Sequence, residues 1–167
     1  MEQKEKIIKA SAEYFKLGWE NLPVKLGINP KTGKKLPIFP KWENGKTVSW
    51  SDDTFTKEST LALIDRYNCN GLAIKTGKNS NLFVLDCDQP LDLAQQYLEE
   101  NNINIPDDTP SVKTQSNGLQ HYFQFHKDLE NITSTGAKIF GVGSPVDIRG
   151  NKGLVFAPPS IVSGGGK

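Results

Sequence analysis

Residues 81–90 read NLFVLDCDQP, and this stretch runs from four consecutive apolar residues into two acids, Asp86 and Asp88. A short apolar run bounded by turn residues predicts a buried β-strand. Side chains alternate between the two faces of a strand, so Asp86 and Asp88 share one face and Cys87 points to the other. The sequence therefore predicts two carboxylates at the end of a buried strand, with Cys87 packed in the core.

The segments around this strand predict an α+β fold. Apolar periodicity indicates helices over about residues 3–17, 56–67 and 91–102, the second with Thr56 as its N-cap. A short strand is expected over 21–27, followed by a long loop over 27–53 that is rich in Gly, Pro, Lys, Asn and Ser. Three hairpins are predicted, within 71–88, 111–125 and 145–159. Helices interspersed with hairpins favour a mostly antiparallel sheet.

Composition sets limits on the class of protein. The chain has 167 residues, which suits a single domain, and its formal net charge of +1 means that a nucleic-acid partner would have to meet a local basic patch. The charged N-terminus does not resemble a signal peptide, and no apolar run could span a membrane. We therefore expect a cytoplasmic protein without a membrane partner, with two buried thiols. Two Cys and two His are too few for a structural zinc site.

Polar side chains stand at the ends of three predicted strands. His121 opens the strand 121–125, and Asp147 shares a strand face with Arg149. If these strands are antiparallel neighbours, Asp86, Asp88, His121 and Asp147 would meet at one place. Converging carboxylates favour hard divalent cations, Mg²⁺ or Mn²⁺. Two such ions are the usual arrangement for phosphoryl transfer, with His121 and Arg149 contacting phosphate oxygens.

Each of these residues also has a purely structural interpretation. An Asp-x-Asp pair commonly ends a strand as a turn former, and Asp88 could cap the helix that follows Pro90. His121 alone could be a core or sheet-edge histidine, and Asp147 could form a local ion pair with Arg149. The order and context of the residues, taken together, favour the functional interpretation.

Three motifs in order resemble the N-terminal primase/polymerase domain of bifunctional replication proteins from plasmids, phages and prophages, in the archaeo-eukaryotic primase superfamily. GLAIKTGKNSNLFVLDCDQ, at 71–89, is similar to a Thr-Gly turn followed by a strand ending in Asp-x-Asp. TQSNGLQHYFQF, at 114–125, is similar to a Thr-x-Ser-Gly-Gly-x-His-x-Tyr-Phe pattern. VDIRGNKGLVFAPPSIVSGG, at 146–165, resembles a hydrophobic-Asp-hydrophobic-Arg-Gly strand, a glycine turn and Ala-Pro-Pro-Ser. Upstream, ASAEYFKLGWENLPVK (10–25) and GKKLPIFPKW (33–42) resemble the opening helix and loop of the family, so the resemblance covers nearly the whole chain.

This resemblance implies a fold and a domain layout. The fold would be an RRM-like catalytic sheet, at about 71–167, packed with a smaller N-terminal α/β lobe, at about 1–70. The chain ends in SGGGK, and the aromatic strand that follows Ser-Gly in the family is missing. We therefore expect a single catalytic domain cut from a longer protein, with a helicase domain in the full-length chain.

The resemblance also implies a reaction and a set of site residues. The reaction would be template-directed nucleotidyl transfer from an NTP or dNTP to a 3′-hydroxyl, on a single-stranded DNA template with its primer. Asp86, Asp88 and Asp147 would hold two Mg²⁺ or Mn²⁺ ions, and His121 would contact the triphosphate. Further phosphate contacts would come from Ser116, Arg149, Lys35 and Lys113, the last in place of a basic residue that the family has directly before the histidine.

Departures in the second motif keep other functions open. Asn117 and Leu119 enter a glycine-rich stretch, although Asn accepts left-handed turn geometry readily. A non-catalytic module that binds single-stranded DNA or a replication origin would use Trp42, Trp50 and nearby lysines. A nucleotide-sugar transferase also uses Asp-x-Asp at a strand end, but the hairpin pattern does not offer the parallel sheet that it needs.

Overall fold

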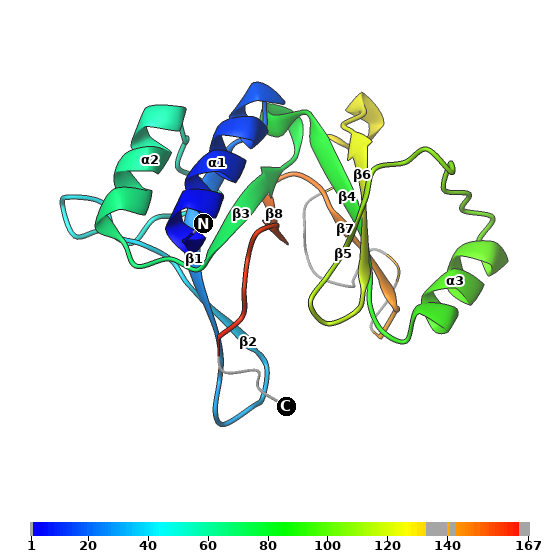
Figure 1. Cartoon of the computed structure of the whole chain (residues 1–167). Coiled ribbons are helices and arrows are strands. Elements are labelled where there is room, and N and C mark those ends of the chain that lie inside the picture. Colours follow the sequence, from blue (N-terminus) through cyan, green and yellow to red (C-terminus); the bar gives the residue numbers. More distant parts are fainter. Residues whose placement is uncertain (1, 133–139, 141–142, 164–167) are drawn as a thin grey trace. The chain divides into compact units, whose positions relative to one another are not determined.

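The structure is a computed structural model that describes residues 2–132, 140 and 143–163. It divides the chain into two compact units, residues 1–75 with 154–167 and residues 76–153 (Figure 1). Each unit contains its own four-stranded sheet. This division differs from the expected lobes at about 1–70 and 71–167, because the segments at 71–75 and from 154 onward belong to the first unit.

The first unit is built around a sheet with the strand order β2-β1-β3-β8. Its elements are α1 (Gln3–Lys16), β1 (Asn21–Ile28), β2 (Lys35–Ile38), α2 (Lys57–Arg66), β3 (Gly71–Thr76) and β8 (Gly153–Ala157), the last two reaching the boundary of the unit. Both helices lie against β1, and buried apolar side chains such as Leu22, Val24 and Leu63 form the core. The first two predicted helices are confirmed.

The N-terminus of α2 shows how local sequence fixes an element. Thr56 Oγ1 accepts a hydrogen bond from the Ser59 backbone N–H at 3.2 Å, and Ser59 Oγ accepts one from the Thr56 N–H at 3.0 Å. This reciprocal capping box satisfies two backbone donors that the first helical turn leaves without partners. The prediction of Thr56 as N-cap is therefore confirmed.

The second unit is a sheet with the strand order β5-β6-β4-β7. Its elements are a 3₁₀ turn η1 (Lys78–Ser80), β4 (Leu82–Cys87), α3 (Leu91–Glu100), β5 (Ser111–Lys113), β6 (Leu119–Gln124), a second turn η2 (Lys127–Leu129) and β7 (Val146–Arg149). The pairs β4–β6, β4–β7 and β5–β6 are antiparallel. Helix α3 packs on one face of this sheet, burying Ala94 and Leu98 against Leu85 and Cys87.

The predicted α+β fold with antiparallel sheets is confirmed, but two of the three hairpins are wrong. β5 and β6 pair as expected. β3 and β4 lie in different sheets, joined only by the bridge between Gly77 and Leu82 among the described residues, and β7 and β8 also lie in different sheets. The reason is that both edges of β4 are taken by β6 and β7, which leaves no edge for β3.

Two smaller findings complete the fold. The expected loop over 27–53 contains the strand β2, which pairs antiparallel with the second half of β1. Within the described ranges, none of the helices has the length and apolar content that a membrane-spanning segment requires.

Candidate active site

The two faces of the second sheet differ in chemistry, and strand register assigns each residue to one of them. Directly opposed residues of an antiparallel pair lie on the same face. Asp86 lies opposite Gln120 of β6 and opposite Asp147 of β7, and Arg149 follows two residues after Asp147. These four residues define the carboxylate face. Cys87 lies on the other face, buried beneath α3, so the predicted separation of Asp86 from Cys87 is confirmed.

One arginine holds the two central carboxylates of this face. Arg149 Nη2 lies 3.3 Å from Asp86 Oδ2, and Arg149 Nη1 lies 3.1 Å from Asp147 Oδ2. The side chains of Asp86 and Asp147 are only 15% and 6% exposed. Like charges at a shared, poorly hydrated position repel, and a guanidinium with forked donors offsets that repulsion. The pair with its arginine still carries a net charge of −1.

Asp88, unlike Asp86 and Asp147, does not lie within a strand. It lies one residue beyond the end of β4 and is exposed, and its backbone N–H donates to the Pro145 carbonyl at 2.8 Å. Over residues 2–132, 140 and 143–163, no three His, Cys, Asp or Glu side chains stand close enough to hold one metal ion. The structure thus brings together Asp86 and Asp147 but not a finished set of three carboxylate ligands.

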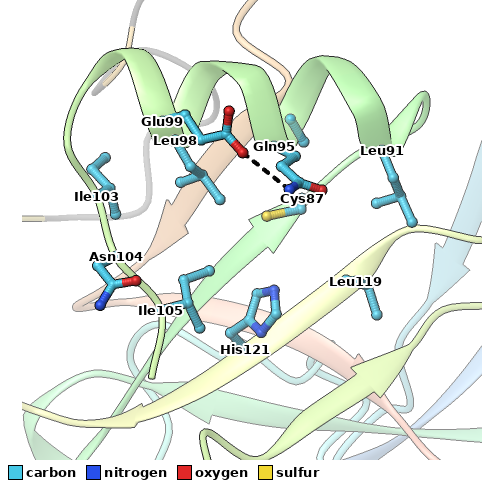
Figure 2. A pocket seen from close by; sticks show the side chains of 11 residues that line it. Cys87, Leu91, Gln95, Leu98, Glu99, Ile103, Asn104, Ile105, Leu119 and His121 are labelled. Carbon is cyan, nitrogen blue, oxygen red and sulfur yellow. Dashed lines mark hydrogen bonds between the residues drawn. The ribbon is translucent and has the colours of Figure 1, made fainter. Parts of the chain in front are cut away.

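The prediction that His121 joins the carboxylates is wrong. His121 lies opposite Leu85 in the register, so it belongs to the face covered by α3. There it lines a cavity of about 350 Å³ together with Cys87 and residues of α3 (Figure 2). Its Nδ1 lies 2.7 Å from Ser111 Oγ, and partial burial lowers the pKa of its imidazole below the ordinary value. The alternation of the strand turns His121 away from Asp86.

Gln120 occupies the position on the carboxylate face that was assigned to His121. It is 6% exposed and lies opposite Asp86, and its Oε1 accepts a hydrogen bond from the Tyr122 hydroxyl at 3.2 Å. The sequence contained a feature that would have placed residue 120, and not His121, on this face. Counted from Thr114, the Thr-x-Ser-Gly-Gly-x-His-x-Tyr-Phe pattern puts its histidine at residue 120, where this chain has glutamine.

The turn between β5 and β6 contains Ser116 and packs against the end of β4 through Gly118. Ser116 Oγ lies 3.1 Å from Thr114 Oγ1, and Asn117 has a φ of 65°, which confirms that asparagine accepts the left-handed turn geometry. A Cβ on Gly118 would lie 2.7 Å from the Cys87 carbonyl oxygen, so only glycine lets the turn pack this closely. Lys113, at the end of β5, is exposed and lies opposite Leu119. It therefore belongs to the face of Cys87 and His121, and the prediction that it joins the carboxylates at a phosphate site is wrong.

Lys35 belongs to the first unit, at the start of β2. Its Nζ lies 5.3 Å from the centre of the Phe156 ring, which is a cation–π distance. Its expected contact with a nucleotide stays a prediction.

The donor chemistry of the carboxylate face suits a hard divalent cation. Asp86 and Asp147 offer carboxylate oxygens, the ligands that Mg²⁺ and Mn²⁺ prefer, and their residual negative charge would favour a cation. Arg149 contacts Oδ2 of each carboxylate, and Asp147 Oδ1 accepts a hydrogen bond from the Ile148 N–H at 2.9 Å. Each carboxylate oxygen has more than one lone pair, so these oxygens could still serve as ligands. The residues therefore fit such an ion in type.

Comparison with known proteins assigns the chain to a family. No curated protein matches the chain. A family model described as the N-terminal domain of bifunctional DNA primase/polymerase matches residues 11–167, and this range contains both sheets. We conclude that the chain belongs to the family of bifunctional DNA primase/polymerase N-terminal domains.

Proposed function

We propose that this domain catalyses metal-dependent, template-directed nucleotidyl transfer from an NTP or dNTP to a 3′-hydroxyl. Membership of the family indicates a nucleotidyltransferase-type enzyme in general. The observation that carries the specific proposal is the pair of Asp86 and Asp147, opposed on neighbouring strands and held by Arg149. Carboxylates held opposite one another on neighbouring strands suit such chemistry, because catalysis of this kind consists mainly of positioning and electrostatic stabilisation.

The residues would divide the work as follows. Asp86 and Asp147, with Asp88 at the strand end, would hold the Mg²⁺ or Mn²⁺ ions. The bound ions would lower the pKa of the attacking hydroxyl and neutralise charge on the leaving group. Arg149 keeps both carboxylates oriented and adds positive charge near the phosphates.

Gln120 would contribute a neutral donor in this site. Its Oε1 accepts a hydrogen bond from the Tyr122 hydroxyl, so its amide N–H groups can donate hydrogen bonds on the carboxylate face. Ser116, in the β5–β6 turn, would add a hydroxyl for the triphosphate. We include in the proposal a single-stranded DNA template with its primer, and a replication protein of plasmid, phage or prophage origin that also carries a helicase.

Primer extension tests the proposal directly. A purified chain should add nucleotides to a primed single-stranded template with Mg²⁺ or Mn²⁺, and the same assay without primer would reveal initiation. Asp86→Asn and Asp147→Asn should each lower the rate by about 10²- to 10³-fold, since each removes a proposed metal ligand and a charge at the reacting phosphate.

Asp108→Asn is the matched control, because it makes the same chemical change in an exposed loop of the same unit. It should incorporate nucleotides at the unsubstituted rate, and thermal unfolding should show that all three variants are folded. Undiminished incorporation by the double variant Asp86→Asn/Asp147→Asn would show that the site is wrong.

A second candidate is a non-catalytic module that binds single-stranded DNA. Gln120 at the histidine position of the motif favours it, because glutamine cannot exchange a proton. Tight, salt-sensitive binding of DNA with no incorporation under either metal would support this candidate over the enzyme.

A further inference from the structure

Positive charge is concentrated in one segment of the first unit. Residues 21–42 contain five lysines and no Asp or Glu, whereas the whole chain has a net charge of +1. The remainder of the chain therefore carries a net charge of −4. A local basic surface on an otherwise acidic chain is the electrostatic pattern expected of a site for a polyanion.

The structure folds most of this segment into a two-stranded ribbon. β1 changes partner halfway: residues 21–24 pair with β3, and residues 25–28 pair with β2 at 35–38. We call residues 25–38 the basic ribbon (Figure 1). Its turn is closed by a hydrogen bond of 2.8 Å from the Asn29 N–H to the Lys34 carbonyl, and Gly33 takes a φ of 65° there. The turn thus holds Lys31 and Lys34 on a defined backbone.

One face of the ribbon combines charge with exposed apolar side chains. Lys25 lies opposite Ile38, and Gly27 lies opposite Leu36, so these residues share a face. Ile38 and Leu36 are 47% and 40% exposed, and Lys25 is also exposed. Charge beside apolar surface suits a ligand that offers both phosphates and the faces of unpaired bases.

The lysines of this ribbon are not engaged with carboxylates. Within the described part of the chain, no Asp or Glu oxygen lies within 4.0 Å of the ammonium group of Lys25, Lys31 or Lys34. By contrast, Lys4 and Lys78 elsewhere are paired with acids at 2.9 Å. Three ammonium groups are thus available to a ligand.

Protection of a sheet edge does not account for this arrangement. Edge strands often carry Lys and Pro to prevent pairing with another chain, which explains Lys35 and Pro37 of the edge strand β2. Lys25 lies on the inner strand β1, and Lys31 and Lys34 lie in the turn. Edge protection therefore does not account for these three lysines.

We propose that the basic ribbon binds the phosphate backbone of single-stranded nucleic acid, with Lys25, Lys31 and Lys34 as the phosphate contacts. The choice of nucleic acid over an anionic lipid surface rests on the proposed function. Each lysine that neutralises a phosphate of a single strand releases condensed counterions, which makes the affinity depend on salt.

Fluorescence anisotropy with a labelled oligothymidylate, without metal or nucleotide, tests the ribbon. The variant Lys25→Gln/Lys31→Gln/Lys34→Gln should raise Kd at least about tenfold at low salt. The slope of log Kd against log salt concentration should fall by about 2, since a single strand contributes about 0.7 for each contact. The arginine variant K25R/K31R/K34R should bind as tightly as the unsubstituted chain, because it keeps the charge.

Lys6→Gln/Lys9→Gln/Lys57→Gln is the matched control, because it removes three exposed lysines from α1 and α2 of the same unit. Its Kd should stay within about twofold of the unsubstituted value. If the two triple glutamine variants lost the same affinity, the effect would come from net charge alone, and the proposal would be overturned. Tighter binding of a matched duplex, or ribbon-dependent binding only to phosphatidylserine vesicles, would overturn it as well.

The outcome does not depend on catalysis. Asp108→Asn should bind the oligonucleotide like the unsubstituted chain, because the change lies in an exposed turn of the other unit. If the chain incorporates no nucleotide but its binding still depends on the ribbon, only the proposed nucleotidyl transfer is contradicted. If it incorporates nucleotides but the ribbon variant leaves Kd unchanged, only the proposed role of the basic ribbon is contradicted.

Discussion

At the scale of single residues, the alternation of strands decides what each side chain can do. Asp86 and Cys87 are neighbours in sequence but lie on opposite faces of β4. Gln120 and His121 are separated in the same way on β6. The sequence predicted the separation of Asp86 from Cys87 correctly, because the alternation of side chains within one strand shows which of its residues share a face. It misplaced His121, because the phase of β6 relative to β4 depends on register, which a single strand does not reveal. The spacing of the family pattern from Thr114 was the one sequence feature that pointed to residue 120.

The burial of His121 has a consequence for stability. Burial lowers the pKa of its imidazole, so the folded state disfavours the protonated ring. The unfolded chain therefore binds a proton more readily than the folded chain. Neutral His121 makes its full contribution to the free energy of unfolding when the pH is above the pKa of the unfolded state. This contribution is lost as the pH falls through the lower pKa of the folded state. The free energy of unfolding, measured with urea, should therefore fall between neutral pH and pH about 5 by more in the unsubstituted chain than in His121→Gln.

His126→Gln is the comparison variant, since His126 is exposed beyond β6 and its Nδ1 contacts only the neighbouring Asp128 among the contacts described, accepting from its N–H at 3.3 Å and lying 3.3 Å from its Oδ2. The NMR titration of the two imidazoles should give a lower pKa for His121 than the ordinary value of about 6.5. Parallel stability curves for His121→Gln and the unsubstituted chain would contradict the role of burial.

At the scale of elements, short-range signals predicted well and pairing did not. The three helices formed where periodicity placed them, because an amphipathic pattern and a capping residue act within a few residues of sequence. Tertiary packing determines which strands pair. The turn residues at Gly77 and Gly153 therefore marked a change of chain direction, but the strands on either side of each turn do not form a hairpin. β2 was missed because Lys, Pro and Asn around it resemble a loop, and its pairing depends on β1.

The cap of α2 gives an element-scale prediction. Thr56→Ala removes the oxygen that accepts from the Ser59 N–H, so the free energy of unfolding should fall by about 1 kcal/mol. Chemical denaturation followed by circular dichroism would measure it. Thr54→Ala, an exposed position before the helix, should change stability by less than about 0.5 kcal/mol. Equal effects at the two positions would show that the capping box contributes nothing.

At the scale of the whole molecule, the chain distributes two kinds of charge over two units. The second unit carries the buried carboxylates with Arg149, and the first carries the basic ribbon. The sequence predicted the family, because its motifs are local. Of the predicted cluster, the structure brings together Asp86 and Asp147 but turns His121 to the other face. It did not predict the division at 75 and 154, because β3 and β8 join the first sheet through long-range pairing.

The central claim is that nucleotidyl transfer takes place on the carboxylate face. Gln120 and His121 test it most directly, because they are adjacent in sequence and lie on opposite faces of the same strand. Single-nucleotide incorporation should fall at least about tenfold in Gln120→Ala, which loses a donor beside Asp86, and should change less than about threefold in His121→Ala. A large loss in His121→Ala with full activity in Gln120→Ala, both variants folded, would place the chemistry on the other face and contradict this account.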